Sequence, residues 1–273
     1  AIRRFKDWAN RVPDERHIKQ ARNKQRQIDR MEKVERPVLE RHKIALSLRP
    51  QTRGGQRFIE LTQVLVGFGD EPVLADVDLT VIRGERVGVV GGNGAGKSVL
   101  VKTIVGELEP TDGDVRRGSG IRVGYLAQDA ELPTPERSPI EILRSSHPMS
   151  EGEAVSRLMK FLFDYEQVRR PAKLLSGGER TRLQLLLLML GGANFLVLDE
   201  PTNHLDLESV ERLEAAIEEF DGTVVFVSHD RYFLDRIADR IVEVRDGEVR
   251  AYEGGWSYWR ERTGATRSAL AAT

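Results

Sequence analysis

A glycine-rich octapeptide has the residue types and the spacing that bind phosphate groups. It reads Gly-Gly-Asn-Gly-Ala-Gly-Lys-Ser over residues 91–98, follows a short apolar run at 86–90 and precedes a helical segment at 99–105. In such a loop, backbone N–H groups and a helix N-terminus converge on phosphate oxygens, and glycine lets the backbone approach closely. The lysine would neutralise phosphate charge, and the serine hydroxyl would bind Mg²⁺. A glycine turn with only a structural role is the alternative. The residues predicted to contact phosphate are Gly91, Asn93, Gly94, Ala95, Gly96, Lys97, Ser98 and Val99.

Two adjacent carboxylates end a second apolar run. Residues 195–198 read Phe-Leu-Val-Leu, and Asp199 and Glu200 follow directly. A buried strand that ends on two acids needs a cation or a proton, because burial of uncompensated charge is costly. Asp199 would hold Mg²⁺ through water, and Glu200 would orient or deprotonate an attacking water molecule. An exposed pair at a strand end is the alternative, which the nearby phosphate-binding motif disfavours.

A third segment, residues 175–180, reads Leu-Ser-Gly-Gly-Glu-Arg. Ser176 is placed to cap the N-terminus of a helix, and the two glycines after it leave backbone N–H groups accessible. The segment taken alone is compatible with a second phosphate-binding turn and equally with an ordinary helix cap.

These motifs together resemble the nucleotide-binding domains of ABC-type ATPases. Residues 175–180 match the signature motif of that family, and the other family motifs follow at Gln128, Asp206 and His229. Phe68 lies 23 residues before the glycine-rich loop, where the family has an aromatic residue that stacks on adenine. A histidine at the end of an apolar strand is also compatible with a core residue, but Ser and Asp flank this one.

The resemblance covers residues 58–250 and implies an α/β fold, the P-loop NTPase of ABC type: a mixed or parallel sheet core, an antiparallel β part and an inserted helical subdomain. It implies hydrolysis of ATP to ADP and phosphate with Mg²⁺. The sites are composite, because the signature turn (residues 176–179) of one domain closes over the P-loop (residues 91–98) of another. It assigns catalysis to Glu200 and His229, Mg²⁺ to Ser98, Gln128 and Asp199, adenine stacking to Phe68, contacts in trans to Ser176, Gly177, Gly178 and Glu179, and the D-loop to Asp206.

Periodicity and turn residues indicate the elements that must position these groups. Continuous apolar runs followed by helical segments are typical of buried parallel strands. We predict a nucleotide-binding domain over 54–262, with a helical subdomain at about 129–182 and a flexible tail over 263–273. The predicted strands are 58–66, 77–82, 86–90, 121–126, 195–198, 223–228, 241–245 and 248–252, and 138–190 is predicted to be mainly helical.

The N-terminal residues differ in charge from the rest. Residues 1–57 hold 17 Lys and Arg against 7 Asp and Glu, whereas residues 58–273 hold 25 against 36. Residues 14–35 combine a narrow apolar stripe with many charged side chains, which predicts a basic helical arm and linker over 1–53, part of a coiled coil. Clustered cations attract nucleic acid or an anionic membrane surface. A solvated arm without a partner is the alternative.

Composition excludes several other classes of protein. The 273 residues include no Cys, so disulfides, thiolate catalysis and Cys-type zinc sites are excluded. The five histidines show no metal-ligand spacing, and we expect His17, His42 and His147 to be surface residues. The longest apolar run, residues 185–190, is far shorter than a transmembrane segment, and no targeting signal is recognisable. We therefore predict a cytoplasmic location.

Two further segments resemble one branch of the family, the ABC-F proteins, which are tandem ATPases that act on ribosomes. These are residues 199–206, Asp-Glu-Pro-Thr-Asn-His-Leu-Asp, and the closing segment at 252–259. The basic arm resembles the end of the coiled coil before their second ATPase domain, which implies a C-terminal half whose arm reaches the ribosome and tRNA. Val99 departs from the Thr usual there. His204 is either a contact across the dimer or a capping residue.

The resemblance leaves the biological role open in three ways. The favoured function is ATP-driven closure of two nucleotide-binding domains, in translation regulation or in antibiotic-resistance ribosomal protection. The second domain would come from a missing N-terminal half or from a second copy in a homodimer. The alternative is the ATP-binding subunit of a membrane transporter. A third is an ATP-dependent clamp without useful turnover, which the intact Glu200 and His229 disfavour.

Overall fold

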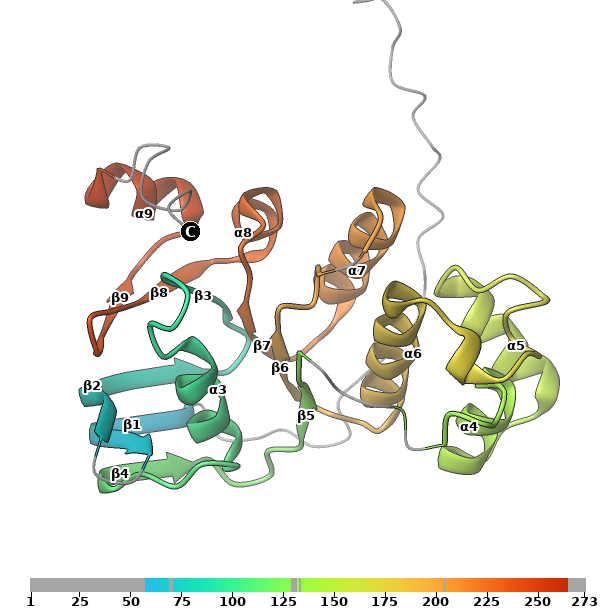
Figure 1. The fold of residues 1–273 in the computed structure, drawn as a ribbon, viewed down its shortest axis with the longest axis horizontal. Helices are drawn as coiled ribbons and strands as arrows, with labels where there is room; N and C mark the ends of the chain where they lie inside the picture. Colours follow the sequence, from blue (N-terminus) through green and yellow to red (C-terminus); the bar gives the residue numbers. More distant parts are fainter. Residues whose placement is uncertain (1–56, 69–70, 129–131, 133, 204, 265–273) are drawn as a thin grey trace, which may run out of the picture. The chain divides into compact units, whose positions relative to one another are not determined.

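The computed structural model describes residues 57–68, 71–128, 132, 134–203 and 205–264 (Figure 1). All of them lie in one compact unit of the chain, Leu46–Thr273. The predicted arm over 1–53 lies outside these residues, as does the predicted tail apart from its first two residues.

The elements are β1 (Arg57–Phe68), β2 (Glu71–Ile82), β3 (Arg86–Val90), α3 (Lys97–Val105), β4 (Asp112–Arg117), β5 (Val123–Leu126), α4 (Pro139–Ser146), α5 (Glu151–Lys160), the 3₁₀ turn η1 (Ala172–Leu174), α6 (Gly177–Leu190), β6 (Phe195–Asp199), α7 (Leu207–Glu219), β7 (Thr223–Val227), α8 (Arg231–Ile237), β8 (Arg240–Arg245), β9 (Glu248–Tyr252) and α9 (Trp256–Thr263).

The central sheet is parallel with one antiparallel edge. Its strand order is β5-β6-β7-β3-β8-β9, and only β9 runs against its neighbour. Every residue of β6 and β7 is buried, as expected for the continuous apolar runs of strands covered on both faces. The predicted α/β fold with a mixed, mainly parallel sheet core is confirmed.

Alternation along the central strands creates two hydrophobic cores. Phe195 and Val197 face one core, together with the side chains of α3 and the second sheet. Leu196 and Leu198 face the other core, which α6, α7 and α8 cover. This parity follows from the two-residue repeat of a strand, and it determines which of the two cores each side chain of β6 faces.

A separate antiparallel sheet has the order β2-β1-β4 and covers α3 from the other side (Figure 1). Two of its features were not predicted. The strand β4 was missed because it has the sequence Asp-Gly-Asp-Val-Arg-Arg, in which only Val115 is even partly buried. The strand β2 begins at Glu71, although its first part lacks a regular apolar alternation. Both segments are held by backbone pairing with β1.

The segment predicted to be mainly helical contains α4, α5, η1 and α6. Ser138 starts α4 with a capping box, in which its hydroxyl accepts from the backbone N–H of Glu141 and the Glu141 carboxylate accepts from the backbone of Ser138. Ser150 caps α5 with its hydroxyl, which accepts from the backbone N–H of Glu153. No helix among the described residues is long and apolar enough to cross a membrane.

Candidate functional site

The carboxyl ends of three neighbouring parallel strands bring together the P-loop, the acidic pair and His229. Val89 of β3 and Asp199 of β6 both pair with Val227 of β7. The P-loop after β3, the acids at the end of β6 and His229 after β7 therefore leave adjacent strands at the same level. Carboxyl ends of parallel strands are where open α/β sheets bind ligands.

Glycine is required in the P-loop for two physical reasons. Gly91, Gly94 and Gly96 have φ angles of 155°, 74° and 105°, a region that other residues rarely occupy. A Cβ atom on Gly91 would also lie 2.3 Å from the carbonyl oxygen of Val244 in β8. The loop can begin in this position only because residue 91 has no side chain.

The N-terminus of α3 has the properties of an anion site. Its N-cap, Gly96, makes no side-chain capping hydrogen bond, and no acidic residue lies in the first turn. The first backbone N–H groups of a helix lack intrahelical partners and carry a partial positive charge. The Val99 side chain is buried, so this residue can offer a ligand its backbone N–H, whereas Asn93 and Ser98 are exposed.

The Lys97 ammonium folds over the P-loop. Its Nζ donates to the carbonyl oxygens of Gly91 and Gly92, at 3.1 and 3.0 Å. Burial lowers the pKa of Lys97, and the nearby carboxylates of Glu200 and Asp199 oppose that shift. The Lys97 ammonium and the N-terminus of α3 therefore both favour an anion at this loop.

Asp199 points toward the start of α3. It shares the strand face of Phe195 and Val197. Burial raises the pKa of Asp199, whereas the nearby Ser98 hydroxyl acts to lower the pKa of this carboxyl group. Its Oδ1 has no hydrogen-bond partner among the described residues. A hydroxyl and a buried carboxylate with an orphan oxygen are hard donors that suit Mg²⁺, with water and phosphate oxygens as further ligands. Within the described part of the chain, no group of three or more His, Cys, Asp or Glu side chains could hold a metal ion by itself. A metal ion here would therefore need water and phosphate oxygens as ligands.

Glu200 and His229 form a pair beside Asp199. His229 Nε2 lies 3.2 Å from Glu200 Oε1, and the backbone N–H of His229 donates to Oε2 at 3.3 Å. The backbone of Glu200 is left-handed, with φ of 52°, and its N–H donates to the carbonyl of Val227. Burial raises the pKa of Glu200, which moves it toward the range in which a carboxylate accepts a proton from water effectively. The Glu200 side chain is 7% exposed and that of His229 is 43% exposed, so solvent and ligands can reach the imidazole.

The signature turn forms a capping box at the start of α6. The Ser176 hydroxyl accepts from Glu179 N–H, and the Glu179 carboxylate accepts from Ser176 N–H at 2.7 Å. The helix-cap interpretation is therefore confirmed within the chain. The N–H groups of Gly177 and Gly178 lie in the first turn, and a role for them as phosphate ligands of another domain stays a prediction.

The other predicted site residues have simpler surroundings. Phe68 ends β1 and is 62% exposed. The strand β2, which pairs with β1, packs against Gly96 of the P-loop through Val73 and Leu74. Gln128 follows β5 and is exposed. Asp206 caps α7 by accepting from Ser209 N–H at 2.7 Å, and this hydrogen bond lowers its pKa. His204 lies outside the described residues, as do His17 and His42.

His147 differs from the prediction. It is half-buried at the end of α4 instead of lying on the surface, and burial lowers its pKa. Its backbone N–H donates to the carbonyl of Leu143, and its ring Nδ1 is buried without a hydrogen-bond partner among the described residues.

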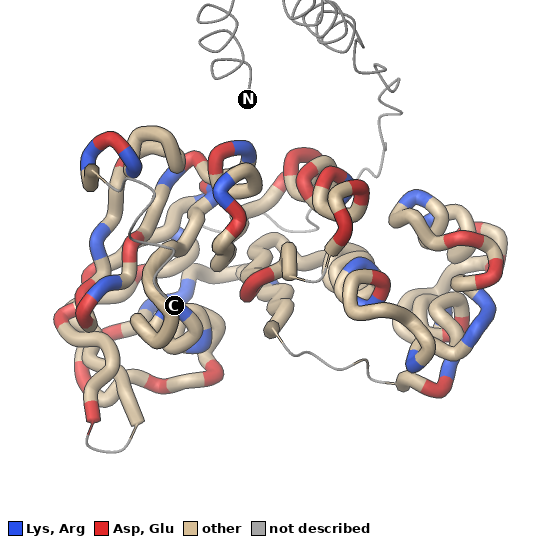
Figure 2. The backbone as a smooth tube through the Cα atoms, turned by 45° about the horizontal axis from the view of Figure 1, so that its top comes forward, with Lys and Arg blue, Asp and Glu red and all other residues tan. Residues whose placement is uncertain are grey.

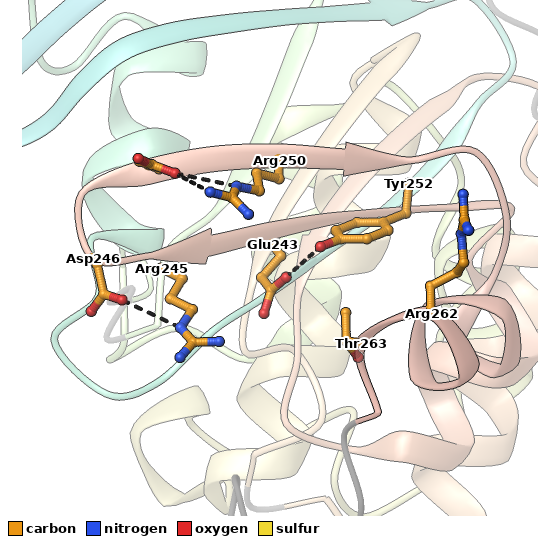
Figure 3. A pocket seen from close by; sticks show the side chains of 8 residues that line it. Glu243, Arg245, Asp246, Arg250, Tyr252, Arg262 and Thr263 are labelled. Carbon is orange, nitrogen blue, oxygen red and sulfur yellow. Dashed lines mark hydrogen bonds and ion pairs between the residues drawn. The ribbon is translucent and has the colours of Figure 1, made fainter.

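A pocket of about 460 Å³ lies on the β8–β9 hairpin and α9 (Figure 3). Most of its charged groups pair with one another: Arg250 with Glu248, Arg245 with Asp246, and Glu243 with the Tyr252 hydroxyl. Because these groups already satisfy each other, we place the candidate site at the P-loop and not in this pocket.

Comparison with known proteins shows what the chain is similar to. Residues 74–203 match a family model described as "ABC transporter". The chain is 38% identical over 246 residues to the "Putative ATP-binding protein YdiF" of Bacillus subtilis (strain 168), covering 89% of this chain and 38% of that protein. It is 36% identical to the "Probable ATP-binding protein YbiT" of Escherichia coli O157:H7, covering 87% and 46%. It is 34% identical to "ABC transporter F family member 5" of Arabidopsis thaliana, covering 89% and 35%.

The chain therefore spans less than half the length of these curated relatives. Among solved structures, it is similar to that titled "Dimeric Structure of MJ0796, a Bacterial ABC Transporter Cassette", with a TM-score of 0.61 and 25% identity over 71% of this chain and 98% of that chain. A second structure of MJ0796, described as dimeric, post-hydrolysis and bound to ADP and Pi, has a TM-score of 0.60 at 24% identity and supports the fold alone.

Proposed function

We propose that this chain, which contains an ATP-binding domain of the ABC type, hydrolyses ATP at sites shared with a second such domain and serves an ABC-F protein on the ribosome. Nucleotide binding closes the two domains, and hydrolysis reopens them. The observation that carries the catalytic part is the buried Glu200 carboxyl beside His229, at the strand end next to the P-loop.

In this proposal each group at the strand ends has one role in hydrolysis. Lys97 and the N–H groups of α3 bind the β- and γ-phosphates of ATP, while Ser98, Asp199 and Gln128 hold Mg²⁺, which neutralises charge on the phosphates. Glu200 accepts a proton from the attacking water while the water oxygen bonds to the γ-phosphorus. ADP leaves with the electrons of the broken P–O bond.

The remaining predicted residues bind ATP in this proposal. His229 contacts the γ-phosphate, and Phe68 stacks on adenine. The turn formed by Ser176, Gly177, Gly178 and Glu179 approaches the γ-phosphate bound by the other domain, with Asp206 near that interface.

A complementation experiment tests whether the sites are shared between domains. Lys97→Ala disables the P-loop, and Ser176→Arg blocks the signature turn, so we expect each variant alone to hydrolyse ATP poorly. An equal mixture contains dimers with one intact composite site, and we expect about a quarter of the wild-type rate if copies pair at random. Phosphate release at high protein concentration measures this. A mixture no more active than its separate components contradicts shared sites in this chain.

The ribosomal role rests on the basic arm and on the relatives whose names place them in the F family. The described domain itself carries an acidic excess, with five glutamates and one arginine on α7 (Figure 2). Attraction to RNA therefore has its source in the excess of cations in the first 57 residues.

Removal of residues 1–50 is expected to weaken binding to ribosomes without changing ATP affinity. The arm supplies the clustered cations, whereas the P-loop lies in the described domain. Co-sedimentation with ribosomes at several salt concentrations checks the first effect, and titration with a fluorescent ATP analogue checks the second. We expect the salt dependence of binding to become shallower in the shortened chain. Unchanged co-sedimentation at every salt concentration contradicts the role of the arm.

A membrane-transporter subunit is the second candidate. The observation that favours it is the presence of exposed apolar side chains in the helical region, Met159, Tyr165 and Leu174, which a partner protein could cover. Ribosome binding by the full chain that depends on residues 1–50 would favour the ABC-F proposal over this one.

A further inference from the structure

The loop between α5 and η1 is hydrogen-bonded directly to the signature turn. The Glu179 carboxylate, which completes the capping box of α6, is only 12% exposed. Besides Ser176 N–H, it accepts from two side chains of that loop. Gln167 Nε2 donates to Oε1, and Arg170 Nη2 donates to Oε2 at 3.1 Å.

The Gln167 amide is fixed at both ends. Its Oε1 accepts from the backbone N–H of Asp164 at 2.7 Å, while its Nε2 donates to Glu179. The Asp164 carboxylate accepts in return from Gln167 N–H at 2.7 Å. A side chain with an acceptor on one side and a donor on the other is therefore needed here, which glutamine supplies and glutamate does not.

A second attachment lies one turn further along α6. Arg182 Nη1 donates to the carbonyl oxygens of Phe161 and Leu162, at 3.2 and 3.1 Å. Its guanidinium carbon lies 5.3 Å from the centre of the Phe163 ring. The first turns of α6 are thus held to residues 161–170 at two points, through a carboxylate and through a guanidinium.

We infer that Gln167 and Arg170 are positioning residues for ATP hydrolysis: through Glu179 they hold the signature turn in the orientation that contacts a phosphate bound by the second domain. This inference rests on the proposed function. The capping box leaves Glu179 too occupied to bind a ligand, so its role is to anchor Ser176, Gly177 and Gly178. A movement of residues 161–170 would be transmitted to the composite site through these hydrogen bonds.

The test isolates the signature turn from the P-loop. Gln167→Ala and Arg170→Ala are each combined with Lys97→Ala, so that the chain contributes only its signature turn, and each is mixed with the Ser176→Arg chain, which contributes only its P-loop. We expect phosphate release to fall about tenfold or more, because hydrogen bonds to a charged group are lost. The KM for ATP should stay unchanged, since the nucleotide is bound by the other copy.

Two further variants separate positioning from general damage to the fold. Arg170→Lys keeps a cation and should recover part of the rate. Gln167→Glu places a carboxylate against Glu179 and should lower the rate of phosphate release more than the other substitutions. Gln167→Glu combined with Glu179→Gln restores a donor–acceptor pair and a capping glutamine, and it should release phosphate faster than Gln167→Glu alone. The matched control is Arg169→Ala, because Arg169 pairs with the exposed Glu151 and does not touch Glu179.

Hydrogen exchange of the backbone amides of residues 176–179 provides a readout that does not need hydrolysis. We expect faster exchange there in Gln167→Ala and Arg170→Ala, and no change in Arg169→Ala. Unchanged exchange, or full hydrolysis by the mixtures despite faster exchange, overturns the inference. If mixtures with unsubstituted Gln167 and Arg170 fail to hydrolyse ATP, the shared-site proposal fails, while the exchange rates still decide whether these residues hold the turn.

Discussion

Replacing Glu200 with glutamine is expected to lower the rate of ATP hydrolysis by about 10²–10⁴-fold while ATP still binds. The amide cannot accept a proton from water, although it has nearly the same shape as the carboxyl group. Because Lys97 and the N-terminus of α3 are untouched, the bound nucleotide should hold two copies together for longer. Phosphate release measures the rate, and light scattering with ATP and Mg²⁺ measures association.

The chain offers a matched control for this substitution. Glu214 in α7 is also buried, and burial raises its pKa, but its partner is Arg236 of α8, 3.1 Å away. Glu214→Gln should therefore leave hydrolysis close to that of the wild type, with any loss confined to stability. ATP-dependent association of Glu200→Gln no greater than that of the wild type would remove Glu200 from the catalytic role.

Gly91→Ala is expected to destabilise the folded chain by about 3 kcal/mol and to abolish tight ATP binding. The new Cβ would lie 2.3 Å from the Val244 carbonyl oxygen. Gly91 directly follows β3, which pairs with the strand β8 that contains Val244, so neither backbone segment can move independently. The start of the P-loop would have to shift away from β8. Denaturant unfolding without nucleotide measures stability, and titration with a fluorescent ATP analogue measures binding.

Two other glycines of the same loop separate the causes. Gly94 has a positive φ of 74° but open space around a Cβ, so Gly94→Ala should cost only the backbone strain, about 1 kcal/mol. Gly92 has open space and no positive φ, so Gly92→Ala should have the smallest effect on stability. Equal stability of the Gly91→Ala and Gly92→Ala chains would show that contact with Val244 does not restrict residue 91.

The sequence was most informative where burial is continuous. The strands β6 and β7 are buried on both faces, so their apolar runs could be recognised without knowledge of their neighbours. The strand β4 could not be recognised, because its polar residues are held by pairing with β1 rather than by burial. His147 was placed on the surface because a lone histidine has no pattern that distinguishes a solvated ring from a half-buried one.

At the candidate site, too, local motifs could be predicted from the sequence and contacts between distant residues could not. Residue types and spacing predicted the P-loop, the acidic pair and the helix cap at Ser176, since each is a local motif with its own physical requirement. The contacts of Gln167 and Arg170 with Glu179 were missed, because they join a loop to a helix across an interval with no repeat or spacing rule.

The sequence by itself determined which side chains are available for chemistry and which strands hold them. Only the tertiary structure decided that β3 lies between β7 and β8, so that the P-loop, Glu200 and His229 meet. It also decided that Asp199 faces Ser98, because strand parity selects a face but only packing determines which helix covers that face. Strand order and helix placement arise from contacts between residues far apart in the chain, whereas periodicity and motif spacing record only near neighbours.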